Sequence, residues 1–245
     1  IQSIGARFAH GEVTLDYAQE MSCRSCASPG GGCHFLGTAG TSQVVGEAMG
    51  LSLPHSALAP SGEEIWLDIA KRSAIALENL AKSNTTVESI ITDDSIYNAM
   101  VLHAAFGGST NLLIHIPAIA HSAGLKIPTV KDWMEINEQV PRLVDVNPNG
   151  PIGHPTVNAF MAGGVPEVML HLRELNLLKL DVKTVSGQTL GKNLIWWEKS
   201  DRRQKLKKIL LKQEGVNADD VIMDPKTAKA KGLTSTMTFP TGNLA

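Results

Sequence analysis

The feature of this sequence that most constrains its fold is a glycine-rich stretch, residues 25–54, that leads one cysteine directly into an apolar helix pattern. The stretch reads SCASPGGGCHFLGTAGTSQVVGEAMGLSLP. Three consecutive glycines, Gly30 to Gly32, permit backbone dihedrals that side chains forbid and let the chain pass close to a bound group. The small residues at 38–41 are candidate N-caps for a helix through Met49. Because the free N–H groups of a helix start favour a thiolate, the pattern predicts Cys33 as a ligand.

The composition is that of a soluble globular protein. With 245 residues, 43% of them hydrophobic and 19% charged, the chain can form one large domain or two small ones with a buried core. Because 22 Lys and Arg face 24 Asp and Glu, and aromatic residues make up only 4%, we expect no nucleic-acid partner. No run approaches the ~18 apolar residues of a membrane span, and no leader opens the chain. We expect a cytoplasmic protein that binds no membrane.

Helical spacing predicts two helices that need no functional explanation. The first lies between residues 60 and 84, where Ser61 and Glu64 match a capping box. Its apolar stripe, predicted to be core, consists of Ile65, Trp66, Ile69, Ala70, Ala74, Leu77 and Leu80. The second helix is predicted from Ile96 to Ala105, and His103 beside its apolar face is expected to be a buried histidine rather than a base.

Other segments carry plainer signals. Residues 13–15 are strand-like and precede a short helical run, residues 129–139 predict a short helix, and Pro166 is expected at the first position of another. Residues 187–224 are more polar and helical, which suggests a linker between domains. Within them, the basic run at 202–208 is interpreted as a solvated helix face.

A turn at 107–111, Gly-Gly-Ser-Thr-Asn, delivers hydroxyls, an amide and bare backbone N–H groups to the start of an apolar helix. Such a start attracts anions, so a substrate carboxylate or phosphate is one reading of it. The other is an Asx or Ser/Thr cap with two glycines for close packing. Pro117 should kink this helix or mark its first turn, and Gly124 should end it. In the later loop PNGPIGHP, His154 is a further site candidate, although turn signals already explain that loop.

The three cysteines leave more than one reading open. Cys23, Cys26 and Cys33 form C-x2-C-x6-C, followed at once by His34. The first pair matches a zinc half-site, but structural zinc usually takes four ligands on two separated knuckles, and no second Cys-x2-Cys exists. Alternatively, the thiols are reduced and pack as small apolar groups. Cys23, Cys26 and His34 therefore stay unassigned.

Several blocks resemble, in collinear order, the dihydroxy-acid dehydratase and phosphogluconate dehydratase family of iron–sulfur hydro-lyases. The blocks are MGLSLP after the cysteine loop, FGGSTN with LLIHIPAIAHSAG, VPRL through HPTVNAFMAGGVPEVMLHL to LLKLDVKTVSGQTLGKNL, and the closing PTGNLA. Within the family, SPGGGCHFLGTAGT and TSTMTFPTGNLA are most similar to the sugar-acid branch, especially D-xylonate dehydratases. The chain departs from the family pattern in the spacing of its neighbouring cysteines, so only Cys33 is matched to a family ligand.

The resemblance implies a fold and a place within a longer protein. We expect an α/β fold in which residues 1–224 form most of a helix-rich N-terminal cluster-binding domain and residues 225–245 begin a β-rich C-terminal domain. Because the chain begins at Ile1 without an initiator methionine, we expect an internal piece of a longer protein. The family also implies a homo-oligomer.

The resemblance further implies the cofactors and the reaction. Cys33 would be one of three cysteine ligands of an iron–sulfur cluster, either 2Fe–2S or 4Fe–4S, with Mg²⁺ as second cofactor. The other cysteines, the magnesium ligands and the catalytic base would lie outside this chain, which alone should not catalyse. Ser109, Thr110 and Asn111 are expected to form part of the pocket wall.

The expected reaction is dehydration of a 2,3-dihydroxy sugar acid such as D-xylonate to a 2-keto-3-deoxy acid. Because three cysteines leave one iron of the cluster with an open coordination position, that iron would polarise the leaving hydroxyl. Mg²⁺ would hold the carboxylate. Three alternatives stay open: a dihydroxy-acid dehydratase of branched-chain amino-acid synthesis, a zinc-stabilised binding module, and a cluster-free α/β enzyme that uses the 107–111 turn as a phosphate cradle.

Overall fold

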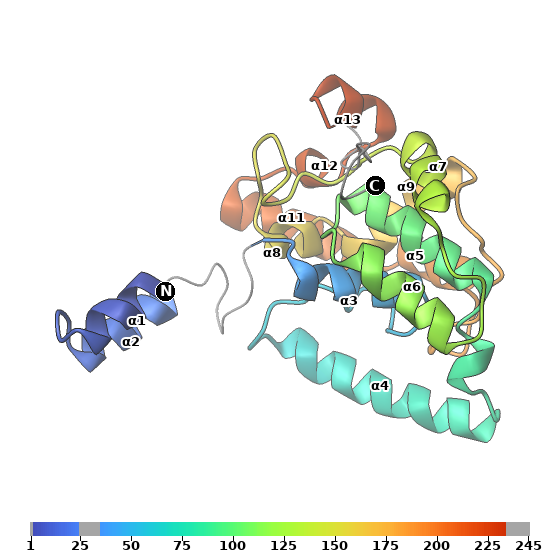
Figure 1. Ribbon diagram of the computed structural model, residues 1–245, viewed down its shortest axis with the longest axis horizontal. Coiled ribbons are helices and arrows are strands. Elements are labelled where there is room, and N and C mark those ends of the chain that lie inside the picture. Colours follow the sequence, from blue (N-terminus) through green and yellow to red (C-terminus); the bar gives the residue numbers. More distant parts are fainter. Residues whose placement is uncertain (1, 25–34, 234–245) are drawn as a thin grey trace.

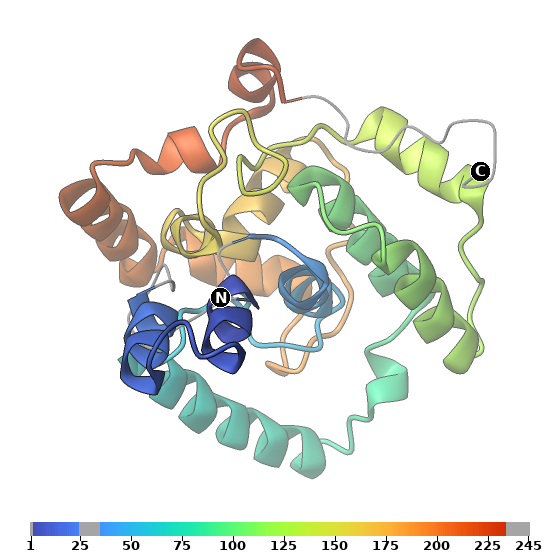
Figure 2. The same cartoon turned by 60° about the vertical axis from the view of Figure 1, so that its left-hand side comes forward.

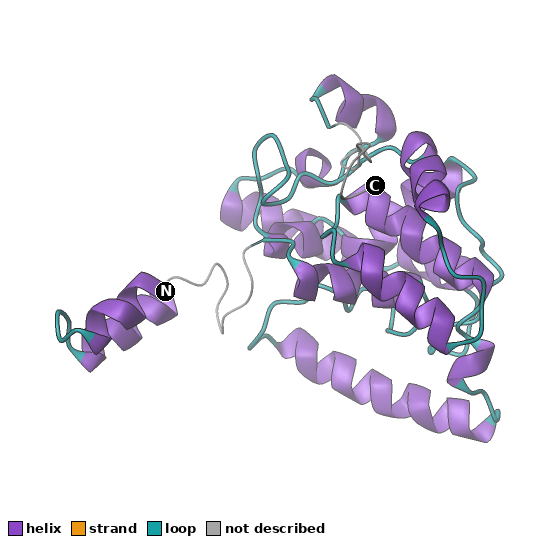
Figure 3. Ribbon diagram, viewed as in Figure 1, coloured by secondary structure: helices purple, strands orange, loops and turns teal. Residues whose placement is uncertain are grey.

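The computed structural model describes residues 2–24 and 35–233, and every regular element in these residues is a helix (Figures 1 and 3). The α-helices are α1 (Gln2–Ala9), α2 (Leu15–Arg24), α3 (Thr38–Ala48), α4 (Glu64–Lys82), α5 (Asp93–Phe106), α6 (Leu112–Ser122), α7 (Val130–Gln139), α8 (Thr156–Met161), α9 (Gly164–Glu174), α10 (Leu190–Glu198), α11 (Asp201–Glu214), α12 (Ala218–Val221) and α13 (Pro225–Ala230). A 3-10 turn, η1, covers Val87–Ser89. None of the helices in the described residues is long and apolar enough to cross a membrane.

The predicted α/β fold is confirmed for its helices, whereas the described residues contain no strand. Their only β pairings are two isolated antiparallel bridges, Val144 with Ile222 and Lys183 with Thr189. Residues 13–15, predicted to be strand-like, lead into α2 instead, because the Thr14 hydroxyl accepts the N–H of Tyr17 at 3.2 Å and caps the helix start. The predicted β-rich start at 225–245 is helical as far as α13, and residues 234–245 lie outside the described residues.

Residues 35–233 pack around one core and are called the body below. Helix α3 is the central element of the body. It packs against α5, α6 and α9, and in Figure 2 it is seen nearly end-on with the other helices around it. Gly40 lets the loop after α3 pack closely on the helix, since a Cβ there would lie 3.3 Å from Leu58 Cδ2. The prediction of a helix from 38 to Met49 is confirmed within one residue, and Gly50 follows it with φ 80°.

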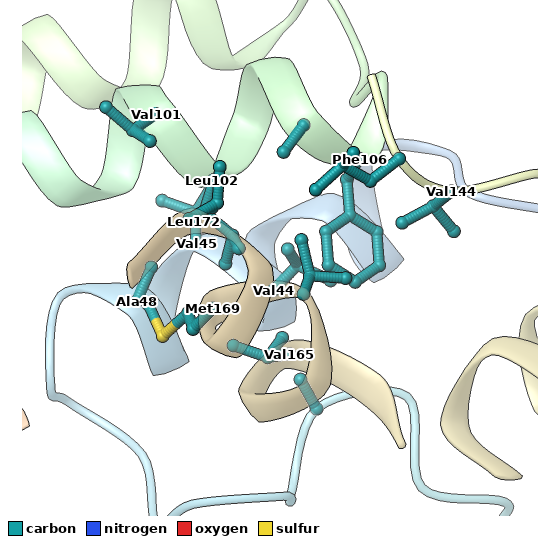
Figure 4. Close-up of a cluster of buried hydrophobic side chains, with 14 of the residues drawn as sticks. Val44, Val45, Ala48, Val101, Leu102, Phe106, Val144, Val165, Met169 and Leu172 are labelled. Atoms are coloured by element: carbon teal, nitrogen blue, oxygen red, sulfur yellow. The ribbon is translucent and has the colours of Figure 1, made fainter. Parts of the chain in front are cut away.

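One apolar core holds the body together. Figure 4 shows its centre, where α3, α5 and α9 meet. The labelled side chains are Val44, Val45 and Ala48 from α3, Val101, Leu102 and Phe106 from α5, Val165, Met169 and Leu172 from α9, and Val144. Because each large apolar side chain contributes roughly 1.5–3 kcal/mol on full burial, this cluster fixes how the three helices cross.

A buried carboxylate anchors the loop that follows α3. Glu47 accepts the backbone N–H groups of His55 at 2.6 Å, Ser56 at 3.1 Å and Ala57 at 2.8 Å. Burial raises the pKa of Glu47 to about 7. The His55 ring stacks between Phe160, at 4.2 Å between ring centroids, and Trp197, at 4.4 Å. The loop is thereby fixed to both α3 and α10.

Helix α4 forms where predicted, but only Ile69 of its predicted apolar stripe is buried in the core. Of the other stripe residues, Trp66 is 43% exposed and Leu77 is 68% exposed. The predicted capping box is also wrong, since Glu63 is the N-cap residue and makes no side-chain cap hydrogen bond. The helix runs along the edge of the body in Figure 1, separated from the loop after α3 by a groove of about 400 Å³.

The segment predicted as a linker, residues 187–224, packs into the same core as the rest. Trp197 of α10 and Leu210 of α11 are fully buried in it, and Ala228 of α13 joins it as well. The interpretation of residues 187–224 as a linker is therefore wrong, because they pack into this core. A domain boundary after residue 224 stays a prediction.

The basic run at 202–208 is not a solvated face, because three of its side chains bind acidic partners. Arg203 donates to Glu167 at 2.7 Å, Lys207 donates to Glu167 at 2.8 Å, and Arg202 donates to Asp68 at 2.6 Å. Burial alone would raise the pKa of Glu167, but the hydrogen bonds from Arg203 and Lys207 outweigh it and lower that pKa to about 2. The basic residues neutralise a buried charge on α9.

Candidate functional site

The starts of α3 and α6 lie side by side and are joined by polar side chains. Thr38 Oγ1 lies 3.3 Å from Ser109 Oγ, and the Asn111 side-chain amide donates to Thr38 Oγ1 at 2.5 Å. Behind them, the Ser109 backbone N–H donates to Thr41 Oγ1 at 3.0 Å. We call Thr38, Thr41, Ser109 and Asn111 the helix-start cluster.

The two glycines before Ser109 let this turn approach α3. Gly107 ends α5 with φ 70°, a left-handed conformation that favours glycine. At Gly108 a Cβ would lie 2.5 Å from Thr41 Cγ2 and 2.7 Å from His103 Cδ2, so a side chain has no room. The prediction of two glycines for close packing is confirmed. Of the two predicted caps, the Asx cap is wrong, because the Asn111 side chain makes no cap hydrogen bond and reaches across to Thr38 instead. The Ser/Thr alternative is supported, since Ser109 Oγ accepts the Asn111 N–H at 3.4 Å.

Exposure separates the three residues predicted to line the pocket. Ser109 is half-buried, whereas Thr110 and Asn111 are exposed. Ser109 and Asn111 meet Thr38, while the Thr110 side chain hydrogen-bonds none of the described residues. The sequence analysis predicted Thr38 and Thr41 only as helix caps. Their i, i+3 spacing places both on one face of α3, which was the only signal that both could contact Ser109.

The electrostatics of these two helix starts favour an anion. Neither α3 nor α6 has an acidic residue in its first turn, so no carboxylate neutralises their positive dipole ends locally. The N–H groups of residues 112–114 at the start of α6 already donate to the carbonyls of residues 109–111, whereas the Thr110 N–H just before them makes no hydrogen bond with the described residues. The side chains between them are neutral hydroxyls and an amide, which donate and accept hydrogen bonds. This arrangement suits a ligand with both a carboxylate and hydroxyl groups.

The loop at 147–155 supports the same corner of the fold. The Asn149 amide donates to the Gly107 carbonyl at 3.1 Å, and the Leu36 N–H donates to the Asn147 carbonyl at 2.6 Å. His154, a candidate from the sequence, is 8% exposed, and its carbonyl accepts the Asn147 N–H at 2.8 Å. Asp145 shapes the loop from inside, because its carboxylate accepts the Gly153 N–H at 2.8 Å. Asn147 and Asn149 were not predicted as part of this region.

Pro117 and His103 belong to the two helices that flank the 107–111 turn. Pro117 lies inside α6, so it does not mark the first turn, and Gly124 follows the helix with φ 68° as predicted. The prediction that His103 is buried is confirmed, since its exposure is 0%.

The predicted metal ligands lie largely outside the described residues. Cys33, Cys26 and His34 fall within 25–34, and Cys23 lies near the end of α2. Among residues 2–24 and 35–233, no three His, Cys, Asp or Glu side chains gather as a metal-binding group. The helix-start cluster offers neutral oxygens and an amide rather than thiolates, so it does not fit an iron–sulfur cluster as a ligand set. The role of Cys33 stays a prediction.

Comparison with known proteins identifies the family. The chain is 66% identical over 245 residues to D-xylonate dehydratase YjhG and 64% identical to D-xylonate dehydratase YagF, both of Escherichia coli K12; each match covers all of this chain and 37% of the relative. A chloroplastic dihydroxy-acid dehydratase of Arabidopsis thaliana is 38% identical over 194 residues, 79% of this chain and 31% of the relative. The chain thus spans about a third of the length of these relatives. Residues 1–193 match the dihydroxy-acid/6-phosphogluconate dehydratase N-terminal family, and the chain belongs to that family.

Proposed function

We propose that the protein of which this chain is part dehydrates a sugar acid of the D-xylonate type to a 2-keto-3-deoxy acid. The observation that carries the proposal is the 64–66% identity to two D-xylonate dehydratases along the full 245 residues. In the reaction the C2–H bond breaks and its proton passes to a base, while the C3–O bond breaks and hydroxide leaves with a proton as water. The resulting enol takes a proton at C3 and becomes the ketone.

The helix-start cluster is the part of this chain that we assign to substrate binding. The first-turn N–H groups of α3 and the Thr110 N–H just before α6 would hold the carboxylate, because nothing acidic competes with it there. Thr38, Ser109 and Asn111 would bind sugar hydroxyls, since each can exchange its present hydrogen bond for one to the ligand. These contacts orient C2 and C3; the base is expected outside this chain.

The cofactor part of the proposal rests on the resemblance of the segment around Cys33 to the family. We propose an iron–sulfur cluster, 2Fe–2S or 4Fe–4S, to which Cys33 contributes one thiolate, and Mg²⁺ bound by residues outside this chain. When bound, the cluster would supply a Lewis acid for the leaving hydroxyl. The described residues supply no ligand set for the cluster. A cytoplasmic homo-oligomer belongs to the same proposal, and mass photometry of the intact protein tests the oligomer.

The experiment uses the intact protein purified without oxygen. We expect a visible charge-transfer absorption that Cys33→Ser abolishes, and conversion of D-xylonate to a 2-keto acid. The matched pair Ser109→Ala and Ser122→Ala then tests the site, because Ser122 is an exposed serine at the far end of α6. We expect Ser109→Ala to raise KM about tenfold, as loss of a hydrogen bond to a charged or polar ligand group implies, and Ser122→Ala to leave it unchanged.

The alternatives predict different outcomes of the same experiment. A dihydroxy-acid dehydratase of branched-chain amino-acid synthesis would prefer a branched-chain 2,3-dihydroxy acid to D-xylonate, although three dihydroxy-acid dehydratases that match are only 34–38% identical. A zinc-stabilised module would hold zinc, show no colour and turn over neither acid. An absorption that persists in Cys33→Ser would reject the cluster assignment. The 245-residue chain alone should turn over neither acid.

A further inference from the structure

His103 lies directly behind the turn that carries Ser109 and Thr110. It belongs to the last turn of α5, is fully buried, and places its Nε2 2.9 Å from the carbonyl oxygen of Ser109. Its ring meets Trp133 of α7 edge to face at 5.3 Å between centroids, and its Cδ2 faces Gly108. The His103 ring is therefore packed between Trp133 and Gly108 and hydrogen-bonded to Ser109.

The partner of Nε2 fixes the protonation of the ring. A carbonyl oxygen only accepts hydrogen bonds, so Nε2 carries the proton and donates it to Ser109. Nδ1 is buried and finds no partner among the described residues, so it holds no second proton there. Burial lowers the pKa of His103, which keeps the ring neutral.

The direction of the Ser109 carbonyl determines the direction of the next N–H. A trans peptide is planar, and its C=O and N–H point opposite ways. The only cis peptide bond among the described residues is Asn147–Pro148, so the bond between Ser109 and Thr110 is trans. With the Ser109 carbonyl aimed inward at His103, the Thr110 N–H points away from the core. That N–H makes no hydrogen bond with the described residues, and Thr110 is exposed.

We propose that His103 is a positioning residue that, by holding the Ser109 carbonyl, turns the Thr110 N–H outward to receive the substrate carboxylate. The inference rests on the proposed function for its ligand and adds the donor and the residue that orients it. His103 does not touch substrate. It acts through the peptide between Ser109 and Thr110, whose carbonyl also accepts the Leu112 N–H at 3.1 Å and so starts α6.

The test compares two substitutions of His103 in the intact enzyme. His103→Phe keeps a ring of similar volume against Trp133 and removes the donor, whereas His103→Gln keeps an N–H donor of similar reach. We expect His103→Phe to raise KM for D-xylonate about tenfold while kcat changes less than threefold, and His103→Gln to recover most of that loss. His121→Gln, an exposed histidine in the last turn of α6, is the control and should match the wild type.

Two measurements that do not depend on the substrate distinguish failure of this inference from failure of the proposed function. Thermal unfolding of each variant shows whether a change in KM reflects a folded enzyme. In the wild type, long-range ¹H–¹⁵N spectra of histidine should show a neutral His103 ring protonated at Nε2, whatever the substrate. An unchanged KM in folded His103→Phe, a His103→Gln as impaired as His103→Phe, or a ring protonated at Nδ1 would each overturn the inference. A wild type inactive toward D-xylonate would refute the proposed function first, and the carboxylate role with it.

Discussion

The side-chain amide of Asn111 donates to the hydroxyl of Thr38 at 2.5 Å, which joins the starts of two helices that lie 73 positions apart in the chain. Asn111 is exposed and Thr38 is half-buried, so the hydrogen bond lies at the surface. Its two groups come from the residue that precedes α6 and the first residue of α3. The relationship makes the two helix starts one surface, on which a single small ligand can contact both.

We predict that Thr38 and Asn111 are coupled in substrate binding. In the intact enzyme, Thr38→Val and Asn111→Ala should each lower kcat/KM, and the double substitution should cost less than the sum by about 1 kcal/mol, because one hydrogen bond is counted in both single changes. Ser42→Ala, one turn along α3 and exposed, is the control. Strict additivity within about 0.3 kcal/mol would show that the two residues act independently.

We predict different effects on stability for Gly108, which lies at this site, and Gly46, which lies further along α3. Gly108→Ala should destabilise by about 2 kcal/mol or more, because its Cβ would lie 2.5 Å from Thr41 Cγ2. Gly46→Ala, inside α3, should be neutral or stabilise by up to about 1 kcal/mol, since its Cβ meets only Ser52 Oγ at 3.8 Å. Urea unfolding of both variants measures the difference. Equal midpoints for the two variants would contradict the close packing at Gly108.

Elements with local signals could be predicted from the sequence. Helix α7 follows Thr129, whose hydroxyl accepts the Asp132 N–H while Asp132 accepts the N–H of Thr129, a capping box formed within four residues. Gly107 and Gly124 end their helices with positive φ, as their type allows. In each case the residues that decide the structure are neighbours in the chain.

The errors arose where the deciding partner is distant. The stripe on α4 has helical spacing whether or not another element covers it, so spacing could not reveal that Trp66 and Leu77 are exposed. The basic run resembles a solvated face until Glu167, 36 positions before Arg203, is known to be buried beside it. Thr38 and Ser109 meet across 71 positions, and no local pattern pairs them.

The buried Glu167 predicts a specific loss of stability in acid. Its pKa in the folded protein is about 2 against 4.5 for an ordinary glutamate, so the stability that it contributes is present above pH 4.5 and is lost as the pH falls toward 2. The shift corresponds to roughly 3 kcal/mol. Urea unfolding between pH 2.5 and 6 should show this loss in the wild type and lack it in Glu167→Gln. Parallel curves for the two proteins would mean that Glu167 is not held ionised by Arg203 and Lys207.

Two adjacent lysines on α11 test whether the basic run neutralises the buried Glu167 or forms a solvated face. Lys207 Nζ lies 2.8 Å from Glu167 Oε1, and its side chain is 22% exposed, whereas Lys208 is exposed. Removing the Lys207 charge leaves a buried carboxylate with one cationic partner fewer, so Lys207→Met should destabilise by about 2 kcal/mol. Lys208→Met should change stability by less than about 0.5 kcal/mol. Since the two residues share charge, size and helix, a solvated basic face would make the two variants equal in urea unfolding, whereas charge neutralisation of Glu167 makes only Lys207 matter.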